Sequence, residues 1–499
     1  MPGSNTEHEA RSEVQQKDVP LESRLAGEQQ TLARPLRSLI RNRPVVCREN
    51  QTVREAVAIM HAEGVGSVVV VDADSRAVGI FTERDLLAAV ARDLDTRSVA
   101  EVMTGAPVSL PAHAFAYEAA LAMIGNHIRH VLVMDDATLI GVVSERDLFS
   151  LQRLGLGELT TEIRLASEIS VLQNLAAEIR KLARLLAEQG VAAEQISLFV
   201  SVLNDRLCQR LIEIVRKRHQ WEQISWCWLG FGSEGRLEQT FSTDQDNGII
   251  FAAHGQASSA EIRARLLPFA REVNEALDAC GFPLCKGNVM ASNPALCLSV
   301  EEWQSKMGGW LENAEPKALL DATICFDFRA LYGDATLATL LREWVLVRTR
   351  AHPAFLRQMA EIALQARPAL GILRSFITED APNAPHSINL KLHGVRLFVD
   401  AARIYALALG LPQTSTVERL RAARAGTGMG ETETEAIVDA FFAIQRLRLR
   451  HQASQDVLTE ETANRIDPDK LNELDRLILK ASFRQARKLQ QRLALDYQL

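Results

Sequence analysis

Residues 226 to 251 read Trp226-Cys-Trp-Leu-Gly-Phe-Gly-Ser-Glu-Gly-Arg-Leu-Glu-Gln-Thr-Phe-Ser-Thr-Asp-Gln-Asp-Asn-Gly-Ile-Ile-Phe251. An apolar run over residues 224–229 and a second over residues 249–252 predict two buried strands. Glycines 230, 232 and 235 follow the first run and indicate a tight turn. The polar residues of this stretch therefore lie between two strands of a predicted α/β domain.

These polar residues predict a site for phosphate and metal. Gly232 has no side chain, so backbone N–H groups there can approach an anion, and Ser233 adds a hydroxyl. Asp244 and Asp246 are two residues apart. In an extended segment this spacing points both carboxylates to one face, where they can share a hard divalent cation.

The aspartates have two other interpretations. Asn247-Gly248 is typical of a two-residue hairpin turn, so the aspartates could be polar residues that lead into it. A calcium loop also begins Asp-x-Asp, but it needs a third ligand at position 5 and glycine at position 6. Here glycine stands at position 5, which excludes the calcium loop.

The spacing Gly232-Ser233, ten residues, Asp244-x-Asp246 resembles the signature of the DNA polymerase beta-like nucleotidyltransferase superfamily. With Lys286-Gly-Asn-Val-Met-Ala-Ser-Asn-Pro294 and Phe326-Asp-Phe-Arg329, the chain is similar to the bacterial CBS-domain-associated nucleotidyltransferases, a family that resembles protein-PII uridylyltransferases. The likeness covers nearly everything from Leu36 to the C-terminus. One departure is Gln245, because the superfamily usually has an apolar residue between its aspartates.

The resemblance implies a reaction and its metal. The Gly-Ser turn would hold a nucleoside triphosphate, UTP or ATP, and Asp244 and Asp246 would hold Mg²⁺. A third carboxylate is expected on a neighbouring strand over residues 324–328, where Asp327 matches best and Asp321 is the alternative. A hydroxyl of the acceptor would attack the α-phosphate, and pyrophosphate would leave.

Arg236 follows the turn and has two interpretations. It either contacts the triphosphate bidentately, as a guanidinium can, or forms a surface salt bridge with Glu234 or Glu238.

A length of 499 residues is too great for one core and predicts three or four domains. The hydrophobic content of 47% and charged content of 24% are ordinary. The net charge of -7 means that the chain has no excess of basic residues to attract phosphate groups, so we expect no nucleic-acid partner. Seven cysteines without a Cys-x-x-Cys pair predict reduced core residues in a cytoplasmic protein. We expect no membrane association, because no apolar run is long enough and no signal peptide is evident.

The first third of the chain contains an internal repeat. Residues 66–72 and 78–86 have similar counterparts about sixty residues later, at residues 130–135 and 140–148. Order, spacing and end motif all recur. This pattern resembles a tandem pair of CBS domains, the Bateman module.

Each repeat ends in a hydroxyl residue followed three positions later by aspartate, Thr82 with Asp85 and Ser144 with Asp147. The resemblance implies that the aspartates bind the ribose hydroxyls of AMP, ADP or ATP and that Thr82 and Ser144 reach the phosphates. The alternative is that Thr82 and Ser144 are helix N-caps with a carboxylate at N3. The two roles can coexist.

We expect an α/β and α multidomain fold. Its segments are a disordered arm (1–35), the tandem CBS pair (36–155), a helical hairpin linker (156–222), a polymerase beta-like nucleotidyltransferase α/β domain (223–349) and a helical bundle domain (350–499). A helix is predicted over residues 259–279. In the resembling family the last domain binds substrate, and Lys391 is the residue we expect to contact phosphate or base, unless it is a solvated surface group. Long helices with narrow apolar faces, together with the CBS pair, favour a homodimer.

Two functions follow from these features. The first is a Mg²⁺-dependent nucleotidyltransferase, regulated by adenine nucleotides at the CBS pair, with a small molecule or a protein as acceptor. The second is a non-catalytic signal-transduction protein that binds nucleotides and acts through contacts with partners.

Overall fold

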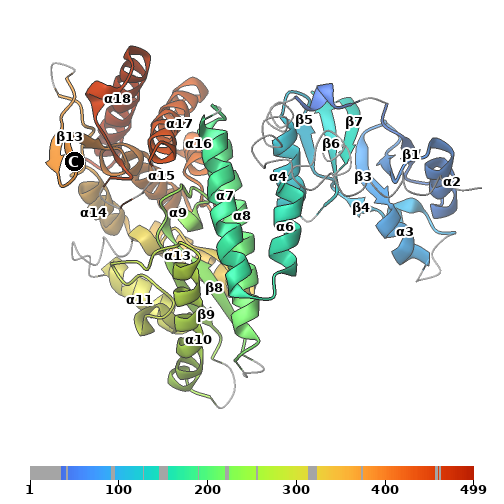
Figure 1. The fold of residues 1–499 in the computed structure, drawn as a ribbon, viewed down its shortest axis with the longest axis horizontal. Helices are drawn as coiled ribbons and strands as arrows, with labels where there is room; N and C mark the ends of the chain where they lie inside the picture. Colours follow the sequence, from blue (N-terminus) through green and yellow to red (C-terminus); the bar gives the residue numbers. More distant parts are fainter. Residues whose placement is uncertain are drawn as a thin grey trace, which may run out of the picture. The chain divides into compact units, whose positions relative to one another are not determined.

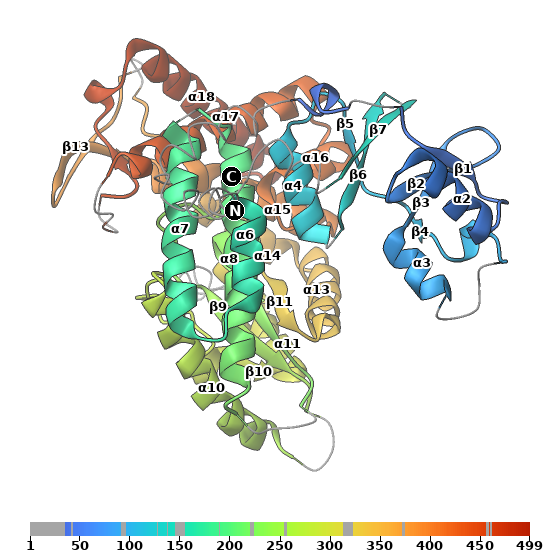
Figure 2. The same ribbon diagram turned by 45° about the vertical axis from the view of Figure 1, so that its right-hand side comes forward.

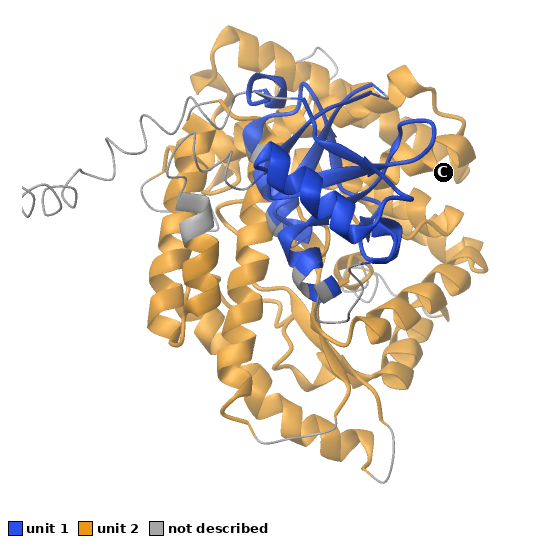
Figure 3. Cartoon of the chain, turned by 90° about the vertical axis from the view of Figure 1, so that its right-hand side faces the viewer, with its two compact units in different colours: residues 1–158 blue, residues 159–499 orange. Residues whose placement is uncertain are grey.

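The computed structural model describes residues 35–40, 43–90, 96–126, 128–136, 138–144, 155–188, 190–219, 224–253, 257–312, 323–371, 375–455, 459 and 462–499. Asp147, Asp321 and residues 1–34 of the expected arm lie outside this set. The chain divides into two compact units, residues 1–158 and 159–499, which Figure 3 colours separately.

The first unit contains the predicted repeat. One sheet has the order β1-β2-β3-β4 and the other β5-β6-β7. In both sheets the first pair of strands is parallel and the second is antiparallel, so the two repeats share one topology. The elements are β1 (Val46–Arg48), α2 (Val53–Glu63), β2 (Ser67–Val71), β3 (Ala77–Thr82), α3 (Glu83–Val90), β4 (Thr104–Gly105), β5 (Ser109–Pro111), α4 (Ala116–Asn126), β6 (His130–Asp135) and β7 (Thr138–Ser144), with short 3-10 turns η1 (Leu36–Ser38) and η2 (Val99–Glu101).

The β-branched runs of the repeat form the interior of this unit. Val68 and Val70 belong to the core of the first repeat, together with Phe81. The alternate residues Val69 and Val71 form a separate buried cluster with Leu132 of β6. Because successive side chains of a strand point to opposite faces, β2 is buried on both sides.

The second unit is built on a four-stranded mixed sheet of order β10-β9-β8-β11. Strand β9 (Asn247–Phe251) pairs antiparallel with β8 (Trp226–Gly230), and Trp228 lies opposite Ile249. On the outer sides, β10 (Cys297–Ser299) runs parallel to β9, and β11 (Arg329–Gly333) runs antiparallel to β8. Every residue of β8 and β9 is buried, as the two apolar runs predicted.

Helices precede, connect and follow the strands of this sheet in the chain (Figures 1 and 2). They are α6 (Gly155–Leu165), which crosses the boundary between the units, α7 (Ile169–Glu188), α8 (Ala193–Arg216), α9 (Gly232–Gly235), α10 (Ser259–Ala279), η3 (Pro294–Leu296), α11 (Val300–Glu312) and α13 (Ala335–Arg350). The predicted helix over residues 259–279 is confirmed. Its start is fixed by a capping box, in which Ser258 and Glu261 each accept a hydrogen bond from the other's backbone N–H.

The α7–α8 hairpin belongs to the second unit and packs together along its length (Figures 1 and 2). The buried residues of α7 recur at steps of three and four and include Leu172, Leu175, Ile179 and Ala183. The hairpin therefore forms part of the body of this unit and is more than the linker expected from the sequence.

The C-terminal part is mainly helical but also contains strands. Its elements are α14 (Pro353–Ala363), β12 (Glu379–Ala381), β13 (Ala384–Asn389), the π-helix η4 (Lys391–Val395), α15 (Arg396–Leu409), α16 (Thr416–Thr427), α17 (Glu431–Ala453), β14 (Arg465–Ile466), η5 (Pro468–Lys470) and α18 (Glu473–Asp496). The prediction that this part is helical throughout is wrong, because β12, β13 and β14 form a small sheet. The α/β and α multidomain fold class is confirmed.

Candidate functional site

The glycine-serine turn and the second aspartate are in contact. Gly232 opens the four-residue helix α9 with a φ of 55°, and a Cβ atom on it would lie 3.1 Å from Asp246 Oδ2. The Phe231 N–H donates to the Asp246 carbonyl oxygen at 2.8 Å. The sixteen residues between β8 and β9 thus fold back so that the turn and the aspartate meet, and the two-residue hairpin at Asn247-Gly248 is excluded.

Asp244 and Asp246 form a compact cluster with Cys285. One ligand atom of each of these residues lies within 4.8 Å of the other two. Asp244 is exposed, whereas Asp246 and Cys285 are partly buried. Burial and the neighbouring Asp244 charge raise the pKa of Asp246 to about 7, and the charges of Lys391 and Arg236 oppose this rise. A divalent cation between the carboxylates would relieve their mutual repulsion.

Gln245 connects the aspartate pair to the core. Its side-chain amide donates to the Asn274 and Phe282 carbonyl oxygens at 2.9 and 2.8 Å, and Asn274 Nδ2 donates back to it at 2.7 Å. Asn274 Nδ2 also donates to Asn247 Oδ1, which accepts from the Ala291 N–H. The polar residue that departs from the superfamily pattern is therefore buried and fully hydrogen-bonded, and it fixes the positions on either side of it.

Ser233 and Lys391 lie at the edge of this cluster. No side-chain hydrogen bond of Ser233 occurs among the described residues, so its hydroxyl can turn toward a ligand. The first N–H groups of a helix lack partners within it, which leaves donors at the start of α9. Lys391 is exposed at the start of η4, and its charge acts on Asp246. The C-terminal part thus contributes a cation to the aspartate pair.

Asp327 is not a third ligand of this cluster, which corrects the prediction. Its carboxylate is fully buried and accepts from three arginines, Arg403 (3.0 and 2.6 Å), Arg419 (2.5 Å) and Arg236 (2.7 Å). Burial alone would raise the pKa of Asp327, but the charges of these arginines outweigh it and hold the pKa well below its usual range. Both oxygens are occupied by guanidinium groups, so the carboxylate has no free position for a metal.

The expected strand over residues 324–328 is also wrong. Residues 323–325 are helical, and the strand begins at Arg329, so Asp327 lies in the bend between them. The neighbouring residues Phe326 and Phe328 are buried because they pack in the core of the unit.

Arg236 forms ion pairs instead of facing solvent or a ligand. Its Nε donates to Glu238 at 2.7 Å and its Nη1 donates to Asp327. Its side chain is only 11% exposed. The alternative pairing with Glu238 is therefore present, although it is buried.

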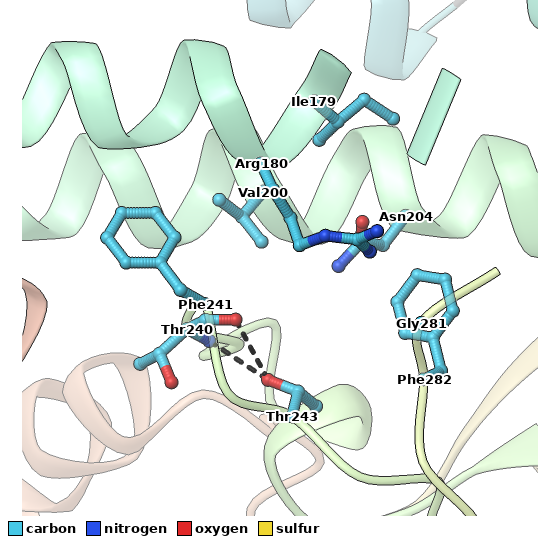
Figure 4. Close-up of a pocket in the computed structure, with 9 residues that line it drawn as sticks. All are labelled: Ile179, Arg180, Val200, Asn204, Thr240, Phe241, Thr243, Gly281 and Phe282. Atoms are coloured by element: carbon cyan, nitrogen blue, oxygen red, sulfur yellow. Dashed lines mark hydrogen bonds between the residues drawn. The ribbon is translucent and has the colours of Figure 1, made fainter. Parts of the chain in front are cut away.

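The α7–α8 hairpin lines two small hollows beside the aspartates, which the sequence did not predict. One is lined by Arg180, Asn204, Thr243 and Phe282, among others, and Figure 4 shows the Arg180 guanidinium reaching toward Asn204. The second shares Asn204 and Phe282 and is bordered by Asp244 and Glu234. Asn204 donates to Gln239 at 3.1 Å. The helical segment before the sheet thus forms one wall of the site.

At the first CBS repeat, Thr82 and Asp85 form the predicted cap. Both the backbone N–H and the hydroxyl of Thr82 donate to Asp85 Oδ2, at 2.9 and 2.8 Å. Asp85 Oδ1 accepts no hydrogen bond among those found in the described part of the chain, which leaves it for a ligand. Ser144 ends β7, and Asp147 lies outside the described residues.

The fold and the site together define the class of this protein: a mixed α/β domain with a glycine-serine turn beside two carboxylates, preceded in the chain by a two-repeat module and followed by a mainly helical domain. Family models agree with this class. Residues 36–92 and 99–153 match the CBS domain, residues 177–317 match "Putative nucleotidyltransferase DUF294", and residues 353–497 match "Putative nucleotidyltransferase substrate binding domain". The chain therefore belongs to the CBS-domain-containing DUF294 nucleotidyltransferase family that its motifs resemble.

Curated relatives match only over about a fifth of the chain. An uncharacterized 17.7 kDa protein of Acidianus ambivalens is 36% identical over 105 residues, which is 21% of this chain and 63% of that protein. Arabinose 5-phosphate isomerase KdsD of Yersinia pestis is 32% identical over 99 residues, 19% of this chain and 30% of the isomerase. The chain spans less than two thirds of the length of these relatives.

Solved structures also match a limited part of the chain. The CBS-domain protein ATU1752 of Agrobacterium tumefaciens is 33% identical and covers 24% of this chain and 96% of its own, with a TM-score of 0.23. The CBS domain protein PAE2072 of Pyrobaculum aerophilum, solved with AMP, is 32% identical. The match covers 26% of this chain and 99% of that protein's chain, with a TM-score of 0.23.

The structure also bears on the cysteines and on possible membrane-spanning helices. All seven cysteines are free, and six of them are buried, as expected for reduced core residues. Within the described part of the chain, no helix combines the length and apolar character that crossing a membrane requires.

Proposed function

We propose that the second unit transfers a nucleotidyl group from UTP or ATP to a hydroxyl of an acceptor. The observation that carries this proposal is that the Gly232-Ser233 turn lies against Asp246, which forms a compact cluster with Asp244. The match of residues 177–317 to a nucleotidyltransferase family supports the same reaction.

Each residue of the cluster would have a separate role. Asp244 and Asp246 would hold Mg²⁺, since two carboxylates at this spacing fit a hard divalent cation. When bound, the ion supplies positive charge that offsets the charge of the triphosphate. The Ser233 hydroxyl and the N–H groups at the start of α9 would hold the phosphates. Lys391 would approach the same phosphates from the C-terminal domain.

The bond changes follow from this placement. The acceptor oxygen would bond to the α-phosphorus, the bond from that phosphorus to the bridging oxygen would break, and pyrophosphate would leave. The acceptor's proton would pass to solvent. The C-terminal domain matches a substrate-binding family, so we assign the acceptor, a protein or a small molecule, to that side of the site.

A direct assay is Mg²⁺-dependent pyrophosphate release from each of the four NTPs, with cell extract as the source of acceptor. Asp244→Asn and Asp246→Asn should each lower the rate by at least about a hundredfold, as expected when a metal ligand is lost. Glu361→Gln, at an exposed carboxylate on α14, is the control and should leave the rate unchanged. Pyrophosphate release that persists in both aspartate variants would contradict the proposed site.

A second candidate is a non-catalytic nucleotide-binding protein that acts through partner contacts. The observation that favours it is the occupation of Asp327 by three arginines, which leaves two carboxylates for the metal. Nucleotide binding without pyrophosphate release from any NTP would support this candidate.

For the first unit we propose that the CBS pair binds AMP, ADP or ATP and that this binding regulates the second unit. Support comes from the CBS family match and from Asp85, which has one oxygen left for a ribose hydroxyl. Asp147 would serve the second repeat. We also propose a homodimer in the cytoplasm with a role in signal transduction.

Calorimetry with the three adenine nucleotides tests the CBS assignment. An Asp85→Ala, Asp147→Ala variant should lose the binding signal. Because Asp85 also caps α3, Glu55→Ala is the matched control, since Glu55 accepts the same two hydrogen bonds from Thr52 at the start of α2. Loss of binding in both variants would assign the effect to fold stability and contradict the ribose contact.

A further inference from the structure

We infer that Cys285 is a third ligand beside Asp244 and Asp246, and that the cluster is a mixed oxygen and sulfur site that binds borderline divalent ions such as Zn²⁺ and Co²⁺. This inference rests on the proposed metal site and adds its metal preference. Its geometric basis is the distance between ligand atoms, since the Cys285 sulfur and one oxygen of each aspartate lie within 4.8 Å of one another. Three donors at such separations can converge on one ion.

The position of the sulfur is fixed by the loop that carries it. The Gln245 N–H donates to the Pro283 carbonyl oxygen at 3.0 Å, and the Gln245 side chain donates to Phe282. On the other side of Cys285, the Asn247 N–H donates to the Val289 carbonyl oxygen at 3.1 Å. The backbone before and after Cys285 is therefore bonded to the residues on either side of Asp246.

The turn after Cys285 lies close to its sulfur. A Cβ atom on Gly287 would lie 3.7 Å from that sulfur, which shows how closely the turn wraps around it. The Cys285 sulfur and one carboxylate oxygen of Asp246 lie within 4.8 Å of each other, so both donors are near enough to share an ion.

Ligand chemistry then decides which ions the site prefers. Carboxylates alone suit Mg²⁺, whereas a thiolate adds affinity for Zn²⁺ and Co²⁺ and none for Mg²⁺. Cys285 is also the one cysteine of the seven that is not buried, and Asp244 beside it is exposed, so an ion can enter from solvent. The sulfur thus makes the site selective among divalent cations.

The test is a titration of the metal-free full-length chain with Co²⁺, followed by ultraviolet and visible absorption. We expect one equivalent of Co²⁺ and a thiolate-to-cobalt charge-transfer band. Cys285→Ser should abolish the band and weaken Zn²⁺ and Co²⁺ binding by at least about tenfold, with Mn²⁺ affinity changed by less than about threefold. Cys280→Ala is the matched control, because it removes a buried cysteine five residues earlier, and it should keep the band.

The outcomes separate this inference from the proposed function. Co²⁺ bound without a charge-transfer band, or a band that persists in Cys285→Ser, would overturn the role of Cys285 while leaving the aspartate site in place. A chain that binds neither Co²⁺ nor Mn²⁺ would overturn both. Thermal unfolding of each variant, monitored by circular dichroism, identifies any loss of binding that comes from misfolding. In a folded Asp246→Asn variant, the binding of both Co²⁺ and Mn²⁺ should be weaker.

Discussion

Gln245 stands between the two aspartates, and its side chain is 3% exposed. A sequence pattern shows that the residue is polar, but it does not show whether a polar side chain faces solvent or a buried partner. Its partner Asn274 lies on α10, and the same Asn274 amide also donates to Asn247 on β9. The aspartates could thus be predicted from spacing, whereas the network that positions them could not.

Gln245→Leu should destabilise the chain by about 2–3 kcal/mol, because it leaves the Asn274 amide and two carbonyl oxygens unsatisfied in the core. Urea denaturation measures this change. The variant should also bind Mn²⁺ more weakly, since the residues on either side would shift. Gln358→Leu, at an exposed position on α14, should change neither quantity. Equal stability of Gln245→Leu and the parent chain would contradict the positioning role.

The buried carboxyl group of Glu234 makes the stability of the folded chain depend on pH. Burial and the charge of Asp205 raise the pKa of Glu234 from 4.5 to about 8, and Arg329 opposes them. Between pH 4.5 and 8 the folded chain therefore binds a proton that the unfolded chain has released, so stability falls as pH rises through this window. Glu234→Gln should remove the fall and gain about 1–3 kcal/mol over the parent chain at pH 8, with little gain near pH 5. Urea midpoints of the two proteins across this range measure the difference, and parallel curves would contradict the assigned pKa.

At the scale of elements, prediction succeeded where a local signal defines the boundary. Helix α10 was predicted correctly because Ser258 and Glu261 mark its start and its apolar face has a clear period. The strand expected over residues 324–328 was wrong because a short apolar run looks the same in a buried bend as in a strand. The C-terminal sheet was missed because β13 pairs with β14, about eighty residues later, and β14 has two residues.

The turn after β8 depends on close backbone contact as well as on dihedral angle. A Cβ atom on Gly235 would overlap the carbonyl oxygen of Asp327. Gly235→Ala should therefore cost more than about 3 kcal/mol or prevent folding, because a backbone atom cannot move aside. Gly309→Ala is the control, since its Cβ would meet nothing within 4 Å inside α11, and it should be neutral or stabilising by up to about 1 kcal/mol. Thermal unfolding compares the two, and equal midpoints would contradict the contact.

At the scale of the second unit, Asp327 connects the sheet domain to the C-terminal helices. Its partners Arg403 and Arg419 lie 76 and 92 residues away in sequence, on α15 and α16. Arg403 also donates to Asp400 at 2.8 Å, and Glu238 accepts from the Thr416 N–H at 2.7 Å. No local pattern relates residues at such separations, so the sequence suggested a metal ligand where the structure has an ion network.

Asp327→Ala should destabilise the second unit by about 3–5 kcal/mol, because three arginines would remain buried without their shared carboxylate. Arg421→Ala, on the same helix as Arg419, removes an exposed ion pair with Glu435 and should cost less than about 1 kcal/mol. Urea denaturation distinguishes the two variants. A loss in Asp327→Ala no greater than that of the surface variant would show that the network contributes little.

The central claim is that Asp244 and Asp246 hold a divalent ion under the Gly232-Ser233 turn. The most direct measurement is a crystal structure of the full chain with Mn²⁺ and a non-hydrolysable nucleoside triphosphate, in which anomalous scattering locates the metal. We predict a manganese peak bonded to both carboxylates, with phosphate oxygens at the turn. Manganese bound elsewhere with the two carboxylates free, or a triphosphate that does not touch the turn, would contradict the account.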